Sequence, residues 1–356
     1  MNIILLSGGS GKRLWPLSND IRSKQFIKIF KTVDGYESMV QRVYRQIKEV
    51  DAEANVTIAT SKTQVSSIHN QLGSAVGVCV EPCRRDTFPA IALATAYLHD
   101  VKGVGLDDAV VVCPVDPYVN NDYFAALKGL SDLAEQGNAN LSLMGIEPTY
   151  PSEKYGYIIP ASADAVSPVK TFKEKPDAAT AKKYIARGAL WNGGVFAYKL
   201  RYVLDKAHDL IDFTDYHDLF NKYETLKKIS FDYAVVENES KIQVMRFAGQ
   251  WKDMGTWNTL TEAMEEPSIG KAILNDTCEG EYMYLFTADG FTGELIECSE
   301  GDLQWVSRDF LDTLPKWEGD QIFLDLLWQD APFFLLTLRY RNDVLTEAVL
   351  NGKKIR

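Results

Sequence analysis

The chain opens with the stretch NIILLSGGSGKRLWPLS at residues 2–18, in which a short apolar run passes directly into glycines and cations. The run Ile3–Leu6 is continuously apolar, as a strand buried on both faces of a parallel sheet should be. The small residues that follow let backbone N–H groups approach a phosphate chain, and Lys12 and Arg13 add positive charge. The stretch therefore predicts a strand that ends in a phosphate-binding loop.

Two common phosphate-binding motifs do not fit this loop. Gly11-Lys12 is followed by Arg13, and no glycine stands five positions before Gly11, so the loop is not a Walker A motif. Leu14 occupies the place of the last glycine in the dinucleotide-binding G-x-G-x-x-G motif. A flexible glycine turn without a ligand remains the alternative interpretation.

Apolar runs alternate with helical patterns through the first two thirds of the chain. The predicted strands are Ile3–Leu6, Val56–Ala59, Val78–Val80, Ala109–Cys113 and Leu141–Gly145, and the predicted helices between them include Glu37–Val50 and Phe88–Leu98. This alternation predicts an α/β fold with a Rossmann-like mixed, mostly parallel sheet flanked by helices. Ligands of such sheets bind at the carboxyl ends of the strands.

Composition narrows the class of protein further. The chain has 356 residues with 38 Lys and Arg against 49 Asp and Glu, a net charge of −11 that disfavours nucleic acid and anionic membranes as partners. Five cysteines, without a C-x-x-C pair, predict free thiols in a reducing compartment. The apolar start is too short for a signal peptide or a membrane span, so we expect a cytoplasmic protein.

The strict alternation ends in the second half of the chain. Strand-like runs after Pro148 predict a substrate-facing insertion, and the composition changes again after Pro267. We therefore expect a catalytic domain at residues 1–267 and a small α+β C-terminal appendage at residues 268–356.

The opening motif and a series of later segments resemble, in the same order, sugar-phosphate nucleotidyltransferases, specifically mannose-1-phosphate guanylyltransferases. The resemblance covers residues 1–278. The matching segments are residues 8–18, Lys24-Gln25-Phe26, Glu81-Pro82 with Arg85-Asp86-Thr87, Pro114-Val115-Asp116, Tyr155-Gly156-Tyr157, Phe172–Pro176, Trp191–Phe196, Phe231–Val235 and Trp251–Trp257.

The resemblance implies a Mg²⁺-dependent enzyme with GTP and mannose 1-phosphate as substrates. It would make GDP-mannose and pyrophosphate by metal-assisted in-line attack on the α-phosphate. Two polyanions must meet in this reaction, so positioning and charge stabilisation carry the catalysis and no protein nucleophile is required. The same chemistry with another sugar 1-phosphate or another nucleoside triphosphate is the alternative.

The resemblance also assigns residues to roles. The implied catalytic residues are Arg13, Lys24, Asp116, Lys175 and Asp253, with Asp116 and Asp253 as the metal ligands. The implied nucleotide-binding residues are Leu6, Gly8, Gly9, Ser10, Gly11, Lys12, Arg13, Glu81, Arg85, Asp86 and Thr87. The implied sugar-phosphate-binding residues are Gly156, Glu174, Lys175, Asn192 and Gly194.

Three positions depart from the pattern of the family. Lys12 replaces a small hydroxyl residue, Asp86 stands where asparagine is usual, and Pro117 follows the implied metal ligand where histidine is common. A carboxylate at position 86 cannot donate a hydrogen bond as an amide can. The preference for a base is therefore less well defined than the type of reaction.

The tail resembles a different family. Residues 281–352 are similar to the C-terminal half of a Nudix hydrolase of the 8-oxo-dGTP diphosphatase kind, but the chain contains no R-E-x-x-E-E motif, and Glu262, Glu265 and Glu266 lack its arginine and spacing. We expect an interaction or dimerisation module without hydrolytic activity, which leaves a homodimer open. The alternatives from other classes are a Nudix-type nucleotide pyrophosphohydrolase and a non-catalytic nucleotide-binding protein.

Overall fold

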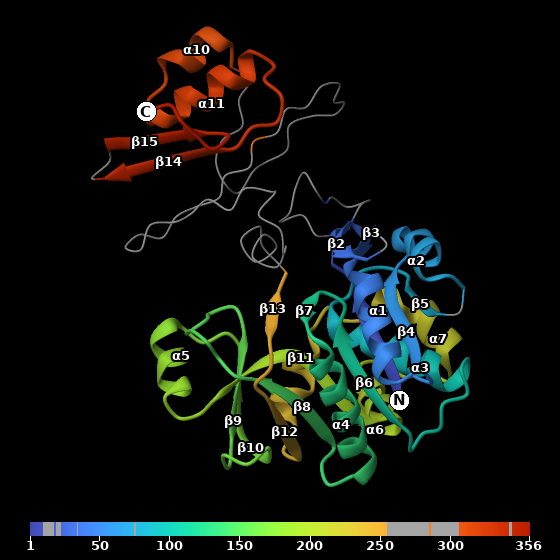
Figure 1. The fold of residues 1–356 in the computed structure, drawn as a ribbon. Helices are drawn as coiled ribbons and strands as arrows, with labels where there is room; N and C mark the ends of the chain where they lie inside the picture. Colours follow the sequence, from blue (N-terminus) through green and yellow to red (C-terminus); the bar gives the residue numbers. More distant parts are fainter. Residues whose placement is uncertain are drawn as a thin grey trace. The chain divides into compact units, whose positions relative to one another are not determined.

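A computed structural model describes residues 1–9, 18, 23–33, 35–74, 76–254, 285, 306–341 and 344–356. The chain folds into two compact units, Met1–Met264 and Glu265–Arg356, and each is described by itself (Figure 1). No helix of the described ranges combines the length and the apolar character that crossing a bilayer requires.

The first unit is built on a sheet of nine strands in the order β5-β4-β1-β6-β11-β8-β12-β10-β9. Only β10 and β11 run against the common direction of the other strands of this sheet, which confirms the predicted mixed, mostly parallel sheet. The strands are β1 (Asn2–Ser7), β4 (Asn55–Ser61), β5 (Gly77–Glu81), β6 (Ala109–Pro114), β8 (Leu141–Ile146), β9 (Gly156–Pro160), β10 (Val166–Lys173), β11 (Leu190–Lys199) and β12 (Ile242–Phe247).

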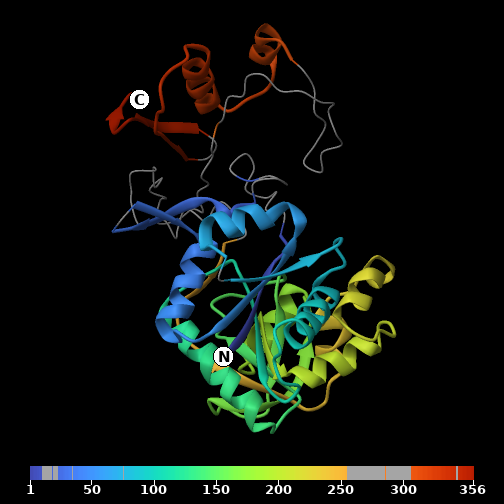
Figure 2. The ribbon, with the colours of Figure 1, turned by 90° about the vertical axis from the view of Figure 1, so that its right-hand side faces the viewer.

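Helices cover both faces of this sheet, as the alternating pattern predicts. They are α1 (Met39–Val50), α2 (Val65–Leu72), α3 (Thr87–Asp100), α4 (Asn121–Gln136), α5 (Ala178–Ile185), α6 (Leu200–His208), α7 (Tyr216–Lys222) and α8 (Phe231–Ala234). Figure 2 shows the blue α1 on one side of the strands and the yellow α7 on the other.

The strand period of two explains why both faces are apolar. Ile3 and Leu5 of β1 belong to the buried cluster that contains α1 and α4, whereas Ile4 belongs to the cluster that contains α3 and α6. Helix α3 is buried almost all round because it packs against β4 and β5 on one side and α6, α7 and α8 on the other. A strand or helix that is buried on two faces therefore carries apolar residues on both of them.

The predicted helix Glu37–Val50 begins later than expected. Glu37 lies in β3 (Gly35–Ser38), which pairs with β2 (Lys28–Thr32), and α1 starts at Met39. The reason is a capping box: the Ser38 hydroxyl accepts from the backbone N–H of Gln41, and the Gln41 side chain accepts from the backbone N–H of Ser38. The reciprocal cap fixes the boundary at Ser38.

The described residues of the second unit form two helices and a small antiparallel sheet. The helices are α10 (Arg308–Thr313) and α11 (Glu318–Trp328), and the sheet has the order β14 (Leu336–Arg341), β15 (Val344–Leu350) and β16 (Lys353–Lys354). The backbone N–H of Gly319 donates to the Tyr340 hydroxyl at 2.7 Å and so ties the start of α11 to β14. The similarity of this unit to a Nudix half stays a prediction, since most of residues 281–305 lie outside the described residues.

Candidate active site

The two predicted metal ligands meet through a short ladder at the ends of distant strands. Asp116 follows β6, and Asp253 ends the strand β13 (Trp251–Asp253). β13 pairs with β7 (Pro117–Val119) so that Asp253 lies opposite Pro117, the residue after Asp116 (Figure 1). The antiparallel register therefore brings the two carboxylates to one edge of the sheet.

Lys24 joins these two carboxylate-bearing segments. Its Nζ lies 2.7 Å from Oδ2 of Asp116 and donates to the backbone carbonyl of Met254 at 3.1 Å. Lys24 begins a 3₁₀ turn, Lys24–Phe26, whose other residues are buried. A cation is thus held between the segment after β6 and the segment after β13.

A buried polar network fixes the loop after β1 relative to Lys24. Oε1 of Gln64 accepts from Ser7 Oγ at 3.1 Å, from Thr60 Oγ1 at 2.8 Å and from Gln25 Nε2 at 3.2 Å. Nε2 of Gln64 donates to Ser23 Oγ at 2.9 Å. Because buried polar groups are costly when left unpaired, this network favours one arrangement of the strand end and the Lys24 turn.

Gly8 and Glu81 lie together at the carboxyl ends of β1 and β5. A methyl group added at Gly8 would lie 3.7 Å from Oε1 of Glu81. Oε2 of Glu81 accepts from the Tyr223 hydroxyl at 2.8 Å, and burial raises the pKa of Glu81. Leu6 and Gly9 belong to the same strand end. Four of the predicted nucleotide-binding residues, Leu6, Gly8, Gly9 and Glu81, thus lie at neighbouring strand ends.

Arg85, Asp86 and Thr87 are engaged in contacts that hold α3 in place. Asp86 is the N-cap of α3 and accepts from the backbone N–H of Thr87 at 2.8 Å. Its φ of +73° and ψ of −176° form a combination that residues other than glycine rarely adopt. Arg85 donates to the backbone carbonyl of Glu224, and Thr87 Oγ1 accepts from the N–H of Phe231 at 2.9 Å. The side chain of Asp86 thus caps α3, a role that asparagine fills equally well.

The predicted sugar-phosphate-binding residues lie close together around β9, β10 and β11. Register places Gly156 of β9 opposite Asn192 of β11, and Glu174 follows β10. A methyl group at Gly156 would lie 2.5 Å from Oε2 of Glu174, 2.9 Å from the Phe172 ring and 3.3 Å from Cβ of Asn192. Only glycine permits this close approach of the three strands.

Lys175 and Gly194 complete this group. Nζ of Lys175 lies 2.7 Å from Oε1 of Glu174, and this hydrogen bond raises the pKa of Lys175. Gly194, at a φ of +71°, donates its N–H to Oδ1 of Asn192 at 3.1 Å. The structure therefore places all five predicted sugar-phosphate residues on β9, β11 and the turn after β10.

Four aromatic rings connect the carboxylate side of the site with the sugar side. Tyr155 lies 5.0 Å from Trp191 and 5.5 Å from Trp251, measured between ring centroids, and Tyr150 lies 5.0 Å from Trp191. Burial, and then the charge of Asp253, raise the pKa of Tyr155. Most of these aromatic residues lie within the segments that resemble the family. The sequence of those segments does not show that the rings pack together.

Asp232 is a further residue that sequence reasoning missed, although its Phe-Asp-Tyr motif is among the matching segments. Its Oδ1 accepts from Nδ2 of Asn192 at 2.6 Å. Burial, and then the charge of Glu174, raise the pKa of Asp232 to about 6, while Asn192 and Lys175 act in the opposite direction. A motif does not reveal a contact between residues on separate elements.

Asp232→Asn is expected to stabilise the fold near neutral pH. The folded-state pKa of about 6 exceeds the ordinary 3.8, so the stability that the protonated form contributes is lost as the pH rises through 6. An amide avoids this loss, so the free energy of unfolding should rise by up to about 3 kcal/mol at about pH 7.5. The gain should shrink towards about pH 4.5 in thermal unfolding of both proteins. A gain that is equal at both pH values would contradict the raised pKa.

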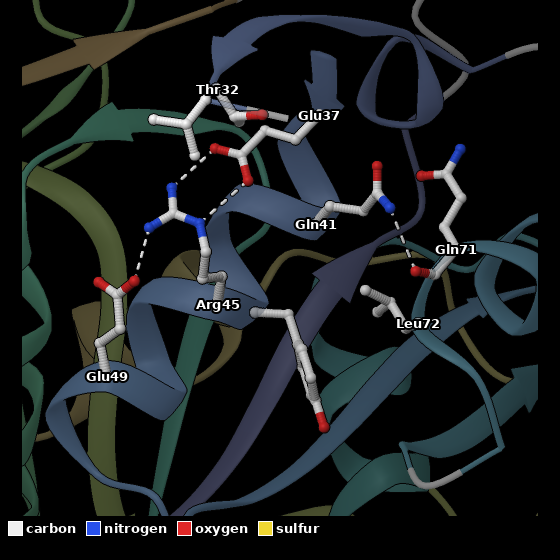
Figure 3. A pocket seen from close by; sticks show the side chains of 9 residues that line it. Thr32, Glu37, Gln41, Arg45, Glu49, Gln71 and Leu72 are labelled. Carbon is white, nitrogen blue, oxygen red and sulfur yellow. Dashed lines mark hydrogen bonds and ion pairs between the residues drawn. The ribbon is translucent and has the colours of Figure 1, made fainter. Parts of the chain in front are cut away.

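The remaining predicted residues Ser10, Gly11, Lys12 and Arg13 lie outside the described residues. A separate hollow between β2, β3, α1 and α2 is lined by polar side chains that pair with one another (Figure 3). Arg45 donates to Glu37 and Glu49, and Gln41 donates to the backbone carbonyl of Gln71. These contacts pair Arg45, Glu37 and Glu49 with one another within the hollow.

Comparisons with known proteins match most of the first unit. The family model described as Nucleotidyl transferase matches residues 2–268. The xanthan biosynthesis protein XanB of Xanthomonas campestris pv. campestris (strain B100) is 31% identical over 309 residues, which cover 79% of this chain and 64% of XanB. A mannose-1-phosphate guanylyltransferase of Escherichia coli is 29% identical over 327 residues, which cover 82% of this chain and 68% of that protein. The chain thus spans less than two thirds of XanB.

Solved structures show the same fold. A crystal structure described as a mannose-1-phosphate geranyltransferase from Thermus thermophilus is 27% identical, with a TM-score of 0.62 over 74% of this chain and 79% of that chain. A UDP-glucose pyrophosphorylase complexed with UDP-glucose is 17% identical, with a TM-score of 0.53 over 74% of this chain and 96% of that chain, and shows the fold alone.

Proposed function

The chain belongs to the nucleotidyl transferase family, as its motifs predicted, and from that membership we propose that it transfers a guanylyl group from GTP to mannose 1-phosphate. The products would be GDP-mannose and pyrophosphate. The observation that carries the proposal is the convergence of Asp116, Asp253 and Lys24 at one strand-end edge. Relatives named as mannose-1-phosphate guanylyltransferases from several bacteria support the choice of substrates.

The proposed reaction exchanges one phosphoanhydride bond for another. An oxygen of the sugar phosphate forms a bond to the α-phosphorus of GTP, while the bond from that phosphorus to the bridging oxygen breaks and pyrophosphate leaves with the electron pair. Both reactants are polyanions, so their mutual repulsion must be offset. Lys24 and Lys175 bring cations from the two sides of the site, and Arg13 is the third cation that the motif implies.

The carboxylates of Asp116 and Asp253 provide oxygen ligands that fit Mg²⁺. This ion prefers oxygen ligands and is commonly bound through one or two carboxylates together with substrate phosphates and water. Asp116 and Asp253 supply two carboxylates. A bound Mg²⁺ would neutralise phosphate charge and orient the triphosphate.

The sugar side offers acceptors and one donor to hydroxyl groups. Glu174 has a largely buried carboxylate, and the Asn192 amide has both donor and acceptor capacity. Gly156 leaves room for a ring to approach the backbone. Lys175 lies next to Glu174, so it is within reach of the same ligand as a partner for the phosphate. These groups suit a hexose 1-phosphate.

Glu174→Gln is expected to weaken discrimination between sugar phosphates more than binding of the triphosphate. A neutral amide accepts hydrogen bonds from hydroxyl groups less strongly than a carboxylate does, and the ion pair with Lys175 is lost. The ratio of kcat/KM for mannose 1-phosphate to that for glucose 1-phosphate should fall by about tenfold. Asp177→Asn, at an exposed helix cap, is the control. An unchanged ratio together with a raised KM for GTP would contradict the assignment.

A grid of four nucleoside triphosphates against several sugar 1-phosphates tests the proposed substrates. Pyrophosphate release is followed in every combination. The highest kcat/KM is expected for GTP with mannose 1-phosphate. A clear preference for another pair would retain the reaction type and correct the substrates.

A further inference from the structure

The carboxylate of Asp232 lies against the sugar side of the site without a role in the proposed chemistry. Asp232 belongs to α8, a helix of four residues. Its side chain is partly buried, and its Oδ1 accepts a hydrogen bond from the Asn192 amide. An acidic side chain is therefore held beside a proposed substrate-binding amide.

The orientation of the Asn192 amide follows from its two contacts. The backbone N–H of Gly194 can only donate, so the Asn192 atom that lies 3.1 Å away must be the oxygen. The nitrogen then faces Asp232 at 2.6 Å, where an ionised carboxylate can only accept. The two contacts agree on the same orientation of the amide.

Both atoms of this amide keep unused capacity. Nδ2 carries two hydrogens and uses one on Asp232, and Oδ1 has two lone pairs and uses one on Gly194. A flipped amide would set its oxygen against the Asp232 carboxylate and its N–H₂ against the Gly194 N–H. The flipped amide would therefore offer its free N–H and its free oxygen lone pair in exchanged positions.

We propose that Asp232 is a positioning residue of the sugar subsite, which holds the Asn192 amide in the one orientation that matches a donor and an acceptor to neighbouring hydroxyl groups of a hexose 1-phosphate. The inference rests on the proposed function and adds a residue to it. Asp232 acts through Asn192.

The position of Asp232 next to another acid supports a role in binding. The charge of Glu174 and burial both disfavour the ionised form of Asp232, so the carboxylate is a cost to the folded state. Stability alone does not account for a buried carboxylate beside a second carboxylate. An unfavourable carboxylate that contacts the Asn192 amide is instead accounted for by a role in orienting that amide.

Steady-state kinetics of four variants tests the proposal. They are Asp232→Ala, Asp232→Asn, Asn192→Ala and the double variant Asp232→Ala with Asn192→Ala. Asp232→Ala should raise KM for mannose 1-phosphate by about 10- to 100-fold, as expected for the loss of a hydrogen bond to a charged group, and leave KM for GTP within about twofold. Asp232→Asn preserves an acceptor and should recover most of the loss.

The double variant separates positioning from a structural effect. If Asp232 acts through Asn192, its removal has no further effect once Asn192 is alanine, so the double variant should match Asn192→Ala. Additive losses, an equal rise of KM for GTP, or an unchanged KM for mannose 1-phosphate in Asp232→Ala would overturn the inference. If Asp232→Ala does not fold, Asp232→Leu, which keeps the bulk of the side chain and removes the acceptor, takes its place alone and with Asn192→Ala.

The wild-type protein distinguishes this inference from the proposed function. Wild-type enzyme that turns over no combination of triphosphate and sugar 1-phosphate would refute the function on which the inference rests. Wild-type turnover with unaltered kinetics in Asp232→Ala would refute the role of Asp232 alone. Direct binding of mannose 1-phosphate, measured by calorimetry, gives a readout that is independent of turnover and should weaken in the same order of variants.

Discussion

Replacement of Asp253 by asparagine is expected to lower the rate of nucleotidyl transfer by about a thousandfold or more. The substitution keeps the shape of the side chain and removes the charge of one of the two carboxylates that we propose as metal ligands. A metal that loses a charged ligand stabilises the phosphates less, and stabilisation of several kcal/mol corresponds to at least about a thousandfold in rate.

The measurement is kcat for pyrophosphate release at saturating Mg²⁺, GTP and mannose 1-phosphate, with the Mg²⁺ dependence of both proteins. Asp132→Asn is the matched control, because Asp132 is exposed on α4 and makes no hydrogen bond or ion pair with a described residue. Thermal unfolding should show that both variants keep the fold. Full activity of Asp253→Asn would exclude Asp253 as a metal ligand.

Lys24→Met is expected to lower kcat by about a hundredfold. The variant removes the cation that the motif assigns to the departing pyrophosphate, and it also removes the partner of Asp116 and of the Met254 carbonyl. Loss of one charge-assisted contact in a transition state typically costs about 10²- to 10³-fold. The effect should fall on kcat more than on KM for mannose 1-phosphate, because the sugar residues lie on other strands.

Lys28→Met gives the matched control for this variant. Lys28 is exposed on β2, four positions further along the chain, and forms no ion pair with a described residue. Its kcat should stay within about twofold of the wild type. A Lys24→Met variant with more than about a tenth of the wild-type kcat would contradict the position of Lys24 in the catalytic group.

Much of the fold could be predicted from local pattern. Ile3–Leu6 is apolar at every position because β1 is covered on both faces, and Phe88–Leu98 is apolar all round because α3 packs between the sheet and other helices. Both patterns report burial directly. The start of α1 was less predictable, because the period of apolar residues does not show where Ser38 caps the helix.

The site was harder to predict than the fold. Asp116 and Asp253 meet through a ladder of two three-residue strands, which are too short for a periodic signal. The contact of Asp232 with Asn192 joins a helix and a strand that lie forty residues apart in the chain, and only the tertiary fold shows it. Asp86 caps α3, and nothing in the structure explains why aspartate rather than asparagine stands at this position.

The central claim is that the strand-end edge catalyses transfer to a sugar phosphate. The most direct measurement incubates the protein with GTP and Mg²⁺, with and without mannose 1-phosphate, and quantifies pyrophosphate and nucleotide sugar together. We predict equal amounts of pyrophosphate and GDP-mannose when mannose 1-phosphate is present, and neither when it is omitted. Release of pyrophosphate and GMP from GTP without any sugar phosphate would contradict the account.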